Sequence, residues 1–503
     1  MDYDELPYPS MPFAYTQPGR LAALSTLFGL QAPPADRARV LELGCASGGN
    51  IIALAARFPN SHFTGIDISG RHIDEGQKRI AALGLSNIDL RLGDLASFEI
   101  GKARCDYIIC HGVFSWVPKD AQDAIFRICS EGLTEHGVAT ISYNVLPGWH
   151  LRTIVRDICL HHVGSHDPPR DRVANARRIL DSIAACADET EPYGLLLRNE
   201  AKRIARRPSA YILGEFLVAD NSPCYFHDFT ERAAKYALSF LCEGDLNSAI
   251  PQIRDPETRR RNKLLAGSNP MALEQYIDFF TGRTFRRSVL IRSQHAAGIK
   301  RDRNLSRLRG LHFSYRPHNL EKAVDPKAST TKDAKLRASK MRHPSVLGAL
   351  QRLAQSYPAT LTLEQLTEGL SADNVSRICS TLLGLVVAGD ATASTLATAV
   401  GRAHHEYPTL WPVARVEAVA KQPWLTSLDH LPVPRDVAPL EFVKLLDGTH
   451  TREALARHAS QTGMTLIGSA NDPAVGRDCP LSGADCVERI LTQLEFCALL
   501  AAC

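Results

Sequence analysis

Residues 39–50 read RVLELGCASGGN and are followed by an apolar helical pattern at 51–58. The run at 40–43 is typical of a buried parallel strand, and the glycines after it break the strand into a turn. Residues 63–66 predict a second strand, which ends at Asp67. An acidic side chain about twenty residues after such a loop can accept two hydrogen bonds from a ribose. The stretch therefore predicts the nucleoside-binding half of a doubly wound α/β fold.

The chemistry of the glycine loop narrows the choice of nucleoside. A dinucleotide fingerprint is G-x-G-x-x-G, whereas this loop has Gly44, Ala46 and Gly48, with Glu42 inside the strand. The E-x-G-x-A-x-G arrangement resembles motif I of class I S-adenosylmethionine (SAM) methyltransferases. The resemblance implies a loop that wraps the methionine part of a cofactor without phosphates. A purely structural turn is the alternative for a glycine loop taken alone.

The alternation of strands and helices continues beyond the second strand. Strands are predicted at 88–92, 106–110 and 137–142, with helices at 72–82 and 119–133 between them. Such repeated units define a parallel sheet with helices on both faces. Asp94 follows the third strand, where its carboxylate is suited to accept from an adenine amino group; a turn or helix-capping aspartate is the alternative.

Length and composition limit the number of domains and the class of protein. The chain has 503 residues, which predicts two to four domains, and its 45% hydrophobic and 22% charged content is typical of a soluble globular protein. We see no run long enough to span a membrane and no signal peptide, and we expect a cytoplasmic location. Thirteen cysteines without a C-x-x-C pair indicate reduced thiols and no structural metal site. A net charge of +4 does not by itself imply nucleic-acid binding.

The segment 3–19 is rich in aromatic residues and proline. Tyr8, Phe13, Tyr15 and Gln17 could form a lid over the cofactor, because aromatic faces attract a sulfonium cation. The alternative is an arm that packs over the edge of the sheet.

Three longer runs carry a specific resemblance. YDELPYPSMPFAYTQPGRL at 3–21, HGVFSWVP at 111–118 and SYNVLPGWH at 142–150 resemble a bacterial family of class I methyltransferases with a methyltransferase regulatory domain. Its characterised relatives include protein lysine methyltransferases that act on a rickettsial outer-membrane protein. The similarity extends through YFHDF at 225–229 and through 272–291, and it is loose beyond them.

The resemblance implies that Glu42, Gly44, Ala46, Gly48, Asp67, Asp94 and the backbone of His111 surround the SAM cofactor. Neighbouring residues of the same loops and two residues of the proposed lid complete the expected set. The expected cofactor-binding residues are Tyr15, Gln17, Glu42, Gly44, Cys45, Ala46, Gly48, Asn50, Asp67, Ile68, Asp94, Leu95 and His111.

Methyl transfer needs alignment, exclusion of water and an unprotonated acceptor. Burial of a lysine in an aromatic pocket lowers its pKa. The candidate catalytic residues are therefore His111, Trp116, Tyr143 and Tyr225, although histidine and tryptophan at such positions are often packing residues. The D/N-P-P-Y/F motif of amino-methylating nucleic-acid enzymes is missing after the fourth strand, where residues 111–114 read HGVF.

The remaining chain is mostly helical in pattern. Helices are expected at 151–162, 172–187, 193–207, 211–217 and 230–243. Two winged-helix-like patterns follow, one over 346–387 and one from 438, and their apolar character favours a protein-interaction or structural role over DNA binding. A basic surface patch is expected from Arg259, Arg260, Arg261, Arg283, Arg286, Arg287 and Arg292.

These patterns predict a doubly wound, Rossmann-like class I methyltransferase sheet followed by mostly helical regulatory and winged-helix-like domains. We expect a SAM-dependent methyltransferase that modifies protein lysine. The alternatives are a small-molecule methyltransferase and a catalytically silent SAM-binding regulator. We also expect a homodimer and neither nucleic-acid nor membrane partners. The expected domains are 1–165 (methyltransferase), 166–320 (helical regulatory), 321–343 (linker), 344–420 (winged-helix-like) and 421–503 (C-terminal, helical or winged-helix-like).

Overall fold

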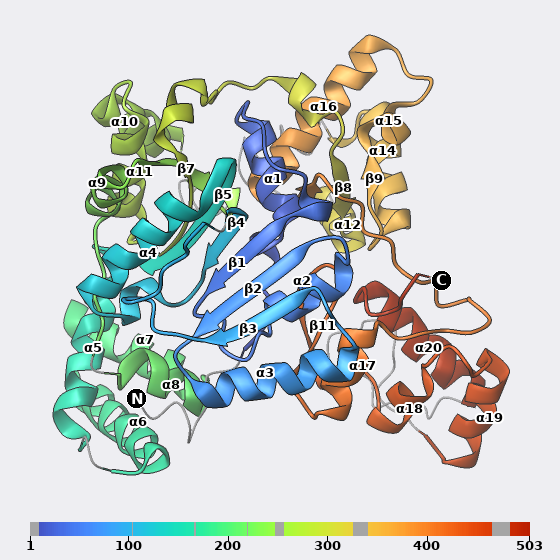
Figure 1. The fold of residues 1–503 in the computed structure, drawn as a ribbon, viewed down its shortest axis with the longest axis horizontal. Coiled ribbons are helices and arrows are strands. Elements are labelled where there is room, and N and C mark those ends of the chain that lie inside the picture. Colours follow the sequence, from blue (N-terminus) through green and yellow to red (C-terminus); the bar gives the residue numbers. More distant parts are fainter. Residues whose placement is uncertain are drawn as a thin grey trace.

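The computed structural model describes residues 10–102, 104–164, 167–218, 220–246, 256–324, 341–464 and 483–502. Its centre is a seven-stranded sheet with the order β3-β2-β1-β4-β5-β7-β6 (Figure 1). Strands β1 to β5 pair in parallel, and β7 runs antiparallel to both of its neighbours. The strands are β1 Arg39–Leu43, β2 His62–Asp67, β3 Ile88–Leu92, β4 Cys105–Cys110, β5 Leu133–Asn144, β6 Leu238–Glu243 and β7 Phe285–Arg292.

Helices cover both faces of this sheet, so the predicted doubly wound fold is confirmed. One face packs against α1, α2 and α3, through side chains such as Leu21, Leu54 and Ile73. The other face packs against α4 and α9, through Ile125 and Phe229. These helices are α1 Pro18–Leu27, α2 Ile51–Arg57, α3 Gly70–Leu83, α4 Lys119–Gly132 and α9 Phe226–Lys235.

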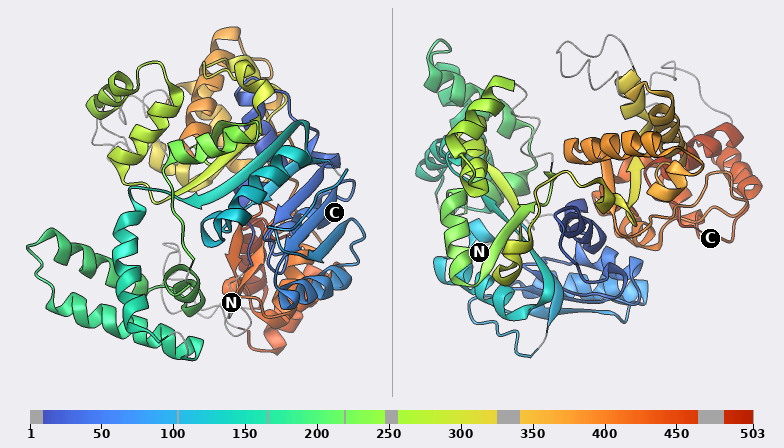
Figure 2. Two further views of the ribbon diagram at one scale, coloured as in Figure 1. Left: turned by 60° about the vertical axis from the view of Figure 1, so that its left-hand side comes forward. Right: turned by 90° about the horizontal axis from the view of Figure 1, so that it is seen from above.

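Four helices between β5 and α9 form a separate branch with its own apolar core. This branch extends away from the sheet (Figure 2). Its expected helices are all present, with the bounds α5 Trp149–His162, α6 Pro169–Cys186, α7 Pro192–Ala205 and α8 Ser209–Phe216.

The chain then returns to complete the sheet. The helix expected over 230–243 is wrong, because α9 ends at Lys235 and Leu238–Glu243 forms β6. Ala237 lies between them with a φ of +54°, a left-handed conformation that interrupts a helix. Since β6 and β7 come from the expected regulatory segment, a boundary at 165 does not separate that segment from the methyltransferase sheet. The helices between β6 and β7 are α10 Pro256–Ala266 and α11 Pro270–Thr281.

A second unit combines helices with the small sheet β10-β8-β9. Its strand β8 precedes the expected boundary at 320, and most of the expected linker at 321–343 lies outside the described residues. The elements are β8 His312–Tyr315, α12 Pro317–Val324, α14 Pro344–Ser356, β9 Leu361–Thr362, α15 Leu363–Thr367, α16 Ala372–Ala388 and β10 Ala391–Ser394.

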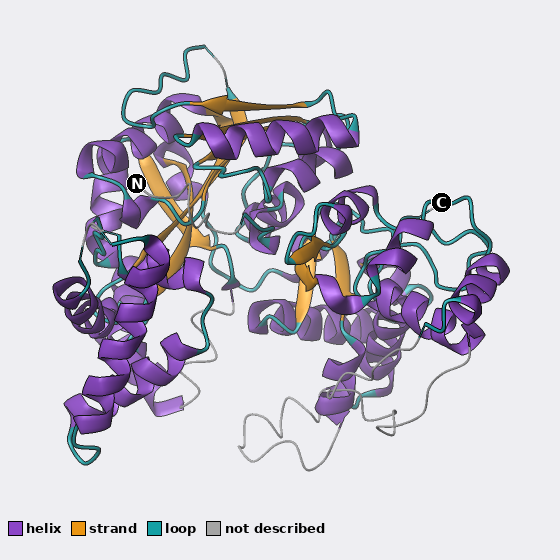
Figure 3. Cartoon of the chain, turned by 90° about the horizontal axis from the view of Figure 1, so that it is seen from below, coloured by secondary structure: helices purple, strands orange, loops and turns teal. Residues whose placement is uncertain are grey.

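A third unit surrounds the two-stranded sheet β11-β12 (Figure 3). Its apolar core begins with Ala403 and includes Ala414 and Ala418 of α17, so the expected boundary at 420 cuts through one core. The elements are α17 Pro412–Val419, β11 Trp424–Thr426, β12 Pro432–Pro434, α18 Leu440–Leu445, α19 Arg452–Gln461 and α20 Gly483–Phe496.

Within the described ranges, no helix combines the length and the apolar character that a membrane crossing requires. The same residues contain no group of three or more histidine, cysteine or acidic side chains that could hold a metal ion.

Candidate functional site

The carboxyl ends of β1, β2 and β4 meet at the point where the strand order reverses, which is where doubly wound folds bind ligands. The loop after β1 is fixed by backbone bonds, because Gly44 N and Cys45 N both donate to Ile66 O, at 2.8 and 3.0 Å. Gly44, Ala46 and Gly48 all have positive φ, at 71°, 46° and 74°. The loop therefore presents a tight turn of backbone above the strand ends, and the buried Cys45 lies beneath it.

Asp67 ties this loop to the end of β2. Its carboxylate accepts hydrogen bonds from Ala46 N at 2.8 Å and from Ser69 N at 3.0 Å. His72 Nδ1 lies 3.6 Å from the same carboxylate. A carboxylate has about four acceptor positions, so Asp67 retains capacity for the hydroxyl groups of a ribose.

Glu42 places a buried carboxyl group beneath the loop. It is 3% exposed, and its Oε1 accepts from Asn50 Nδ2 at 2.8 Å. Burial raises the pKa of Glu42 to about 8. Oε2 is buried and has no hydrogen-bond partner among the described residues. A buried acceptor without a donor is costly, and the ammonium group of a methionine moiety is the kind of donor that would satisfy it.

Two apolar side chains stand exposed beside the crevice. Ile68 follows β2 and is 65% exposed, and Leu92 ends β3 and is 64% exposed. Asp94 is also exposed and accepts from Ala96 N at 2.9 Å, while Leu95 is buried. Apolar surface next to an acceptor is what a planar adenine with an exocyclic amino group requires.

The amino-terminal arm lies directly on the glycine loop. Gly49 N donates to Ser10 Oγ at 2.7 Å, and a Cβ added at Gly49 would come within 2.2 Å of Ser10 O. The Phe13 ring lies 3.7 Å from the His111 ring, and Tyr15 OH is 2.5 Å from His111 Nδ1. The arm therefore contacts the glycine loop through Ser10 and places two aromatic rings against His111, whereas Tyr8 lies outside the described residues.

The Gln17 side chain points away from the crevice, toward the C-terminal unit. Its Nε2 donates to Asp429 O at 2.9 Å, and its Oε1 accepts from Arg57 at 2.9 Å. The side chain is buried at the contact with the C-terminal unit. The structure does not bring Gln17 to the crevice, because its amide is already occupied by that contact.

His111 follows β4 and is held in its neutral form. Burial, followed by the nearby Arg287 guanidinium, lowers the pKa of His111 to about 3. Arg287 also lies 5.1 Å from the Tyr15 ring. Arg287 was expected in a basic surface patch. It lies two residues after Phe285 in β7, and residues two apart in a strand share a face, so this spacing was a signal that one face of β7 reaches the site.

The pKa of His111 predicts an acid-sensitive fold. An unfolded histidine titrates near 6.5, so between pH 6.5 and 3 the unfolded chain binds a proton that folded His111 does not. The free energy of unfolding then falls as pH drops through this range. We expect His111→Gln to reduce the slope of stability against pH, measured by urea unfolding at pH 7 and 5. An unchanged slope would contradict the lowered pKa, and the exposed His150→Gln serves as a control.

The other three candidate catalytic residues lie in or next to segments at the carboxyl end of β5, where Cys224 N donates to Asn144 O at 3.2 Å. Trp116 is half-buried and packs edge-on against Trp149 at 6.0 Å, on the side of the helical branch. Tyr143 is 1% exposed, stacks on Phe229 at 3.9 Å and shares a hydrogen bond with Ser288. The structure therefore places Tyr143 in the core, because its position in β5 points toward α9.

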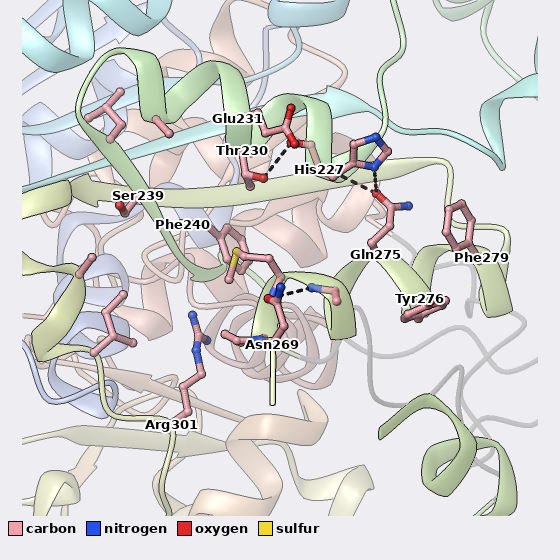
Figure 4. A pocket seen from close by; sticks show the side chains of 17 residues that line it. His227, Thr230, Glu231, Ser239, Phe240, Asn269, Gln275, Tyr276, Phe279 and Arg301 are labelled. Carbon is pink, nitrogen blue, oxygen red and sulfur yellow. Dashed lines mark hydrogen bonds between the residues drawn. The ribbon is translucent and has the colours of Figure 1, made fainter. Parts of the chain in front are cut away.

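Tyr225 contacts two residues of a separate cavity. Its ring stacks on His227 at 5.4 Å and meets Phe279 at 6.0 Å. Both of these residues line a cavity of about 960 Å³ between α9, α11 and β6, together with Gln275 (Figure 4). Since β6 is four strands from β1 in the sheet, this cavity is not the crevice above the glycine loop.

Asn144 was not among the expected site residues. It alternates with Tyr143 along β5, so it shares a face with Ser142, whose Oγ accepts from Gly112 N at 2.8 Å beside His111. Its Nδ2 is buried without a hydrogen-bond partner in the described part of the chain. Asn144 lies in the run SYNVLPGWH that carries the family resemblance, but periodicity alone did not show which polar residue of this run faces the site.

Three protein-family models match the chain. Residues 40–137 match a methyltransferase domain, residues 208–292 a predicted methyltransferase regulatory domain, and residues 406–465 the C-terminal winged helix domain of PKMT.

Two relatives from one organism also match the sequence, one of them over most of the chain. The uncharacterised protein RP789 of Rickettsia prowazekii is 32% identical over 496 residues, which covers 92% of this chain and 87% of that protein. RP028 of the same organism is 36% identical over 242 residues, or 48% of this chain and 97% of the relative. The structure of PKMT2 from Rickettsia typhi, also solved in complex with AdoHcy, superposes with a TM-score of 0.80 at 24% identity and covers 98% of this chain and 100% of that one.

Proposed function

The chain belongs to the methyltransferase family that includes RP789, and from that membership we propose that this SAM-dependent methyltransferase acts on lysine side chains of proteins. The observation that carries the proposal is the PKMT winged helix domain at residues 406–465, joined to a methyltransferase domain and a regulatory domain in one chain. By comparison, the sequence of trans-aconitate 2-methyltransferase of Streptomyces coelicolor matches 18% of this chain.

The crevice fits the cofactor. The Asp67 carboxylate would hold the ribose, Glu42 Oε2 would accept from the ammonium group, and Ile68 and Leu92 would flank the adenine. When bound, SAM supplies a methyl group that its sulfonium already activates. The chain then has to position the acceptor and exclude water.

The residues around His111 favour a methyl acceptor that binds as an unprotonated amine. A His111 with a pKa near 3 is too weak a base to hold a proton at neutral pH. Its ring, together with Phe13 and Tyr15, instead presents aromatic surface. Such surface desolvates a lysine and lowers its pKa, so we assign His111 to positioning and leave proton removal to solvent.

The test is transfer of a labelled methyl group from SAM to a mixture of native proteins, followed by mass spectrometry of the labelled residues. We expect methyllysine in acid hydrolysates, and no label when the protein lysines have been blocked by exhaustive acetylation. Label confined to small amines would favour a small-molecule methyltransferase. SAM binding with transfer to neither class would favour the silent regulator.

The raised pKa of Glu42 makes cofactor binding depend on pH. Glu42 is mostly protonated at pH 7 in the free protein, and an ammonium group beside it would favour the carboxylate. Binding of S-adenosylhomocysteine should therefore release up to one proton, and affinity should rise with pH up to about 8. Calorimetry in phosphate and Tris buffers would count the protons. Glu42→Gln should abolish the release, whereas Glu75→Gln on α3 should not; a wild type without buffer dependence would contradict the assignment.

A homodimer is a further proposal. Leu264 and Leu265 of α10 and Phe279 and Phe280 of α11 are exposed, and exposed large apolar side chains on two neighbouring helices indicate an interaction surface. Light scattering of the purified protein would test it. A cytoplasmic location is likewise proposed, on the ground that the eleven described cysteines are free thiols.

A further inference from the structure

A turn of the C-terminal unit contacts the back of the glycine loop. This turn, residues 427–431 between β11 and β12, is named the wing. Arg57 of α2 donates to Leu428 O at 2.5 Å, and Gln17 Nε2 donates to Asp429 O. Figure 1 shows α17 and β11 next to α2 and α3, and α17 contacts α3. The wing is therefore buried inside the molecule, because Leu428, Asp429 and His430 are each at most 8% exposed.

His430 is the tip of the wing. It is 2% exposed and has a φ of +61°, a left-handed conformation that is uncommon for residues other than glycine. Its Nε2 lies 2.8 Å from Asn50 Oδ1. Asn50 immediately precedes α2 and closes the motif I loop, so a residue about 380 positions away contacts the cofactor motif directly.

The direction of these hydrogen bonds follows from one backbone group. Phe13 N donates to Asn50 Oδ1 at 2.9 Å, and a backbone N–H can only donate. Oδ1 is thus the acceptor, and the His430 Nε2 must carry a hydrogen. Thr16 Oγ1, which donates its single hydrogen to Phe13 O at 2.8 Å, also lies 3.1 Å from this Oδ1. Asn50 therefore joins the wing, the amino-terminal arm and the glycine loop at one atom.

The chain of contacts ends at the cofactor crevice. Asn50 Nδ2 donates to Glu42 Oε1, and Glu42 Oε2 is the buried acceptor that lacks a donor in the described residues. The Asn50 side chain thus bridges His430 of the wing and the carboxylate assigned to the cofactor ammonium. A shift of the wing would move Asn50, and with it both Glu42 and the arm that carries Phe13.

We propose that the wing is a positioning element for the cofactor site, and that His430 couples wing docking to SAM binding. The coupling is reciprocal, because a wing that favours the bound form of the loop must itself be stabilised by the ligand. The inference rests on SAM as cofactor and not on lysine as acceptor. Its test uses S-adenosylhomocysteine binding, so its outcome is independent of the methyl acceptor.

Glycine at position 430 gives a clean variant. Glycine adopts a φ of +61° without strain, so His430→Gly removes the hydrogen bond without a new backbone cost. We expect it to weaken S-adenosylhomocysteine binding about fivefold by calorimetry, the size of one hydrogen bond. Lys421→Gly is the matched control, because Lys421 is exposed, has a φ of +55° and lies in the same unit. Equal affinity of the His430→Gly variant and the wild type would overturn the proposal.

Two further readouts separate coupling from general stability. His430→Gln returns an N–H donor and should recover part of the lost affinity; binding no better than His430→Gly would overturn the role given to Nε2. In the wild type, S-adenosylhomocysteine should slow hydrogen exchange in a peptide covering the wing, far from the ligand in sequence. If the ligand gives the wing no added protection, the proposed coupling does not exist, whatever the folding of the variants.

Discussion

Asp67→Ala should weaken S-adenosylhomocysteine binding about a hundredfold, the largest effect that we expect from a single polar side chain. The carboxylate holds Ala46 N of the glycine loop and has free acceptor positions for a ribose. Each hydrogen bond to a charged group contributes about 1.5–3 kcal/mol, and removal of the side chain loses both the loop contact and the ribose contact. Isothermal calorimetry of the purified variant measures the loss.

The matched control is Asp89→Ala. Asp89 is a partly exposed carboxylate on β3, paired with Arg91 at 2.6 Å, so its removal changes net charge equally without touching the crevice. Affinity should then be unchanged. If the Asp67 variant folds and binds the ligand as the wild type does, the cofactor does not occupy this crevice in the way we assign.

The parts of the fold that depend on local pattern could be predicted from the sequence. The first five strands and the helices between them were expected within a few residues of their ends, since each is a short apolar or amphipathic run bounded by glycine or a polar turn. The strand β6 was expected to be a helix. The run Leu238–Glu243 is apolar and short, and periodicity cannot distinguish a buried strand from a helix in such a run.

Long-range pairing was beyond the reach of local pattern. Arg286 was expected on a basic surface patch, yet it is fully buried, with Asp278 and Glu243 within 2.8 Å of its guanidinium. Its partners lie 8 and 43 residues away. A charge becomes a buried ion pair when the sheet brings strands β6 and β7 together, and that pairing is not encoded in spacing along one strand.

In the candidate site, too, residues placed by local sequence pattern were predicted and residues placed by long-range contacts were not. Gly44 and His111 directly follow strands and Asp67 ends one, so their order in the sequence was enough to predict that they share one edge of the sheet. Gln17 was expected there too, but the C-terminal unit uses its amide. Tyr143 was assigned to the site because it is close in sequence to other site residues. In β5 its side chain points to the opposite face, where it packs in the core against Phe229.

At Gly44, both the backbone conformation and the neighbouring Val113 side chain exclude a Cβ. Gly44 has a φ of +71°, and a Cβ at this position would lie 2.3 Å from Val113 Cγ2. Gly44→Ala must then both adopt a left-handed conformation, at about 1–2 kcal/mol, and displace a valine whose side chain is stiff at χ1. We expect loss of S-adenosylhomocysteine binding by a hundredfold or more, measured by calorimetry, and a lower melting temperature.

Two companion variants separate the two causes. Gly84→Ala tests the backbone cost alone, since Gly84 has a φ of +64°, caps α3 and has nothing within 4 Å of an added Cβ. It should lower stability slightly and leave binding intact. Val113→Ala in the Gly44→Ala background removes the clash and should restore a large part of the affinity, a coupling that a double-mutant cycle measures. Additive effects in that cycle would show that Val113 does not set the shape of the loop, and that glycine is required there for its conformation alone.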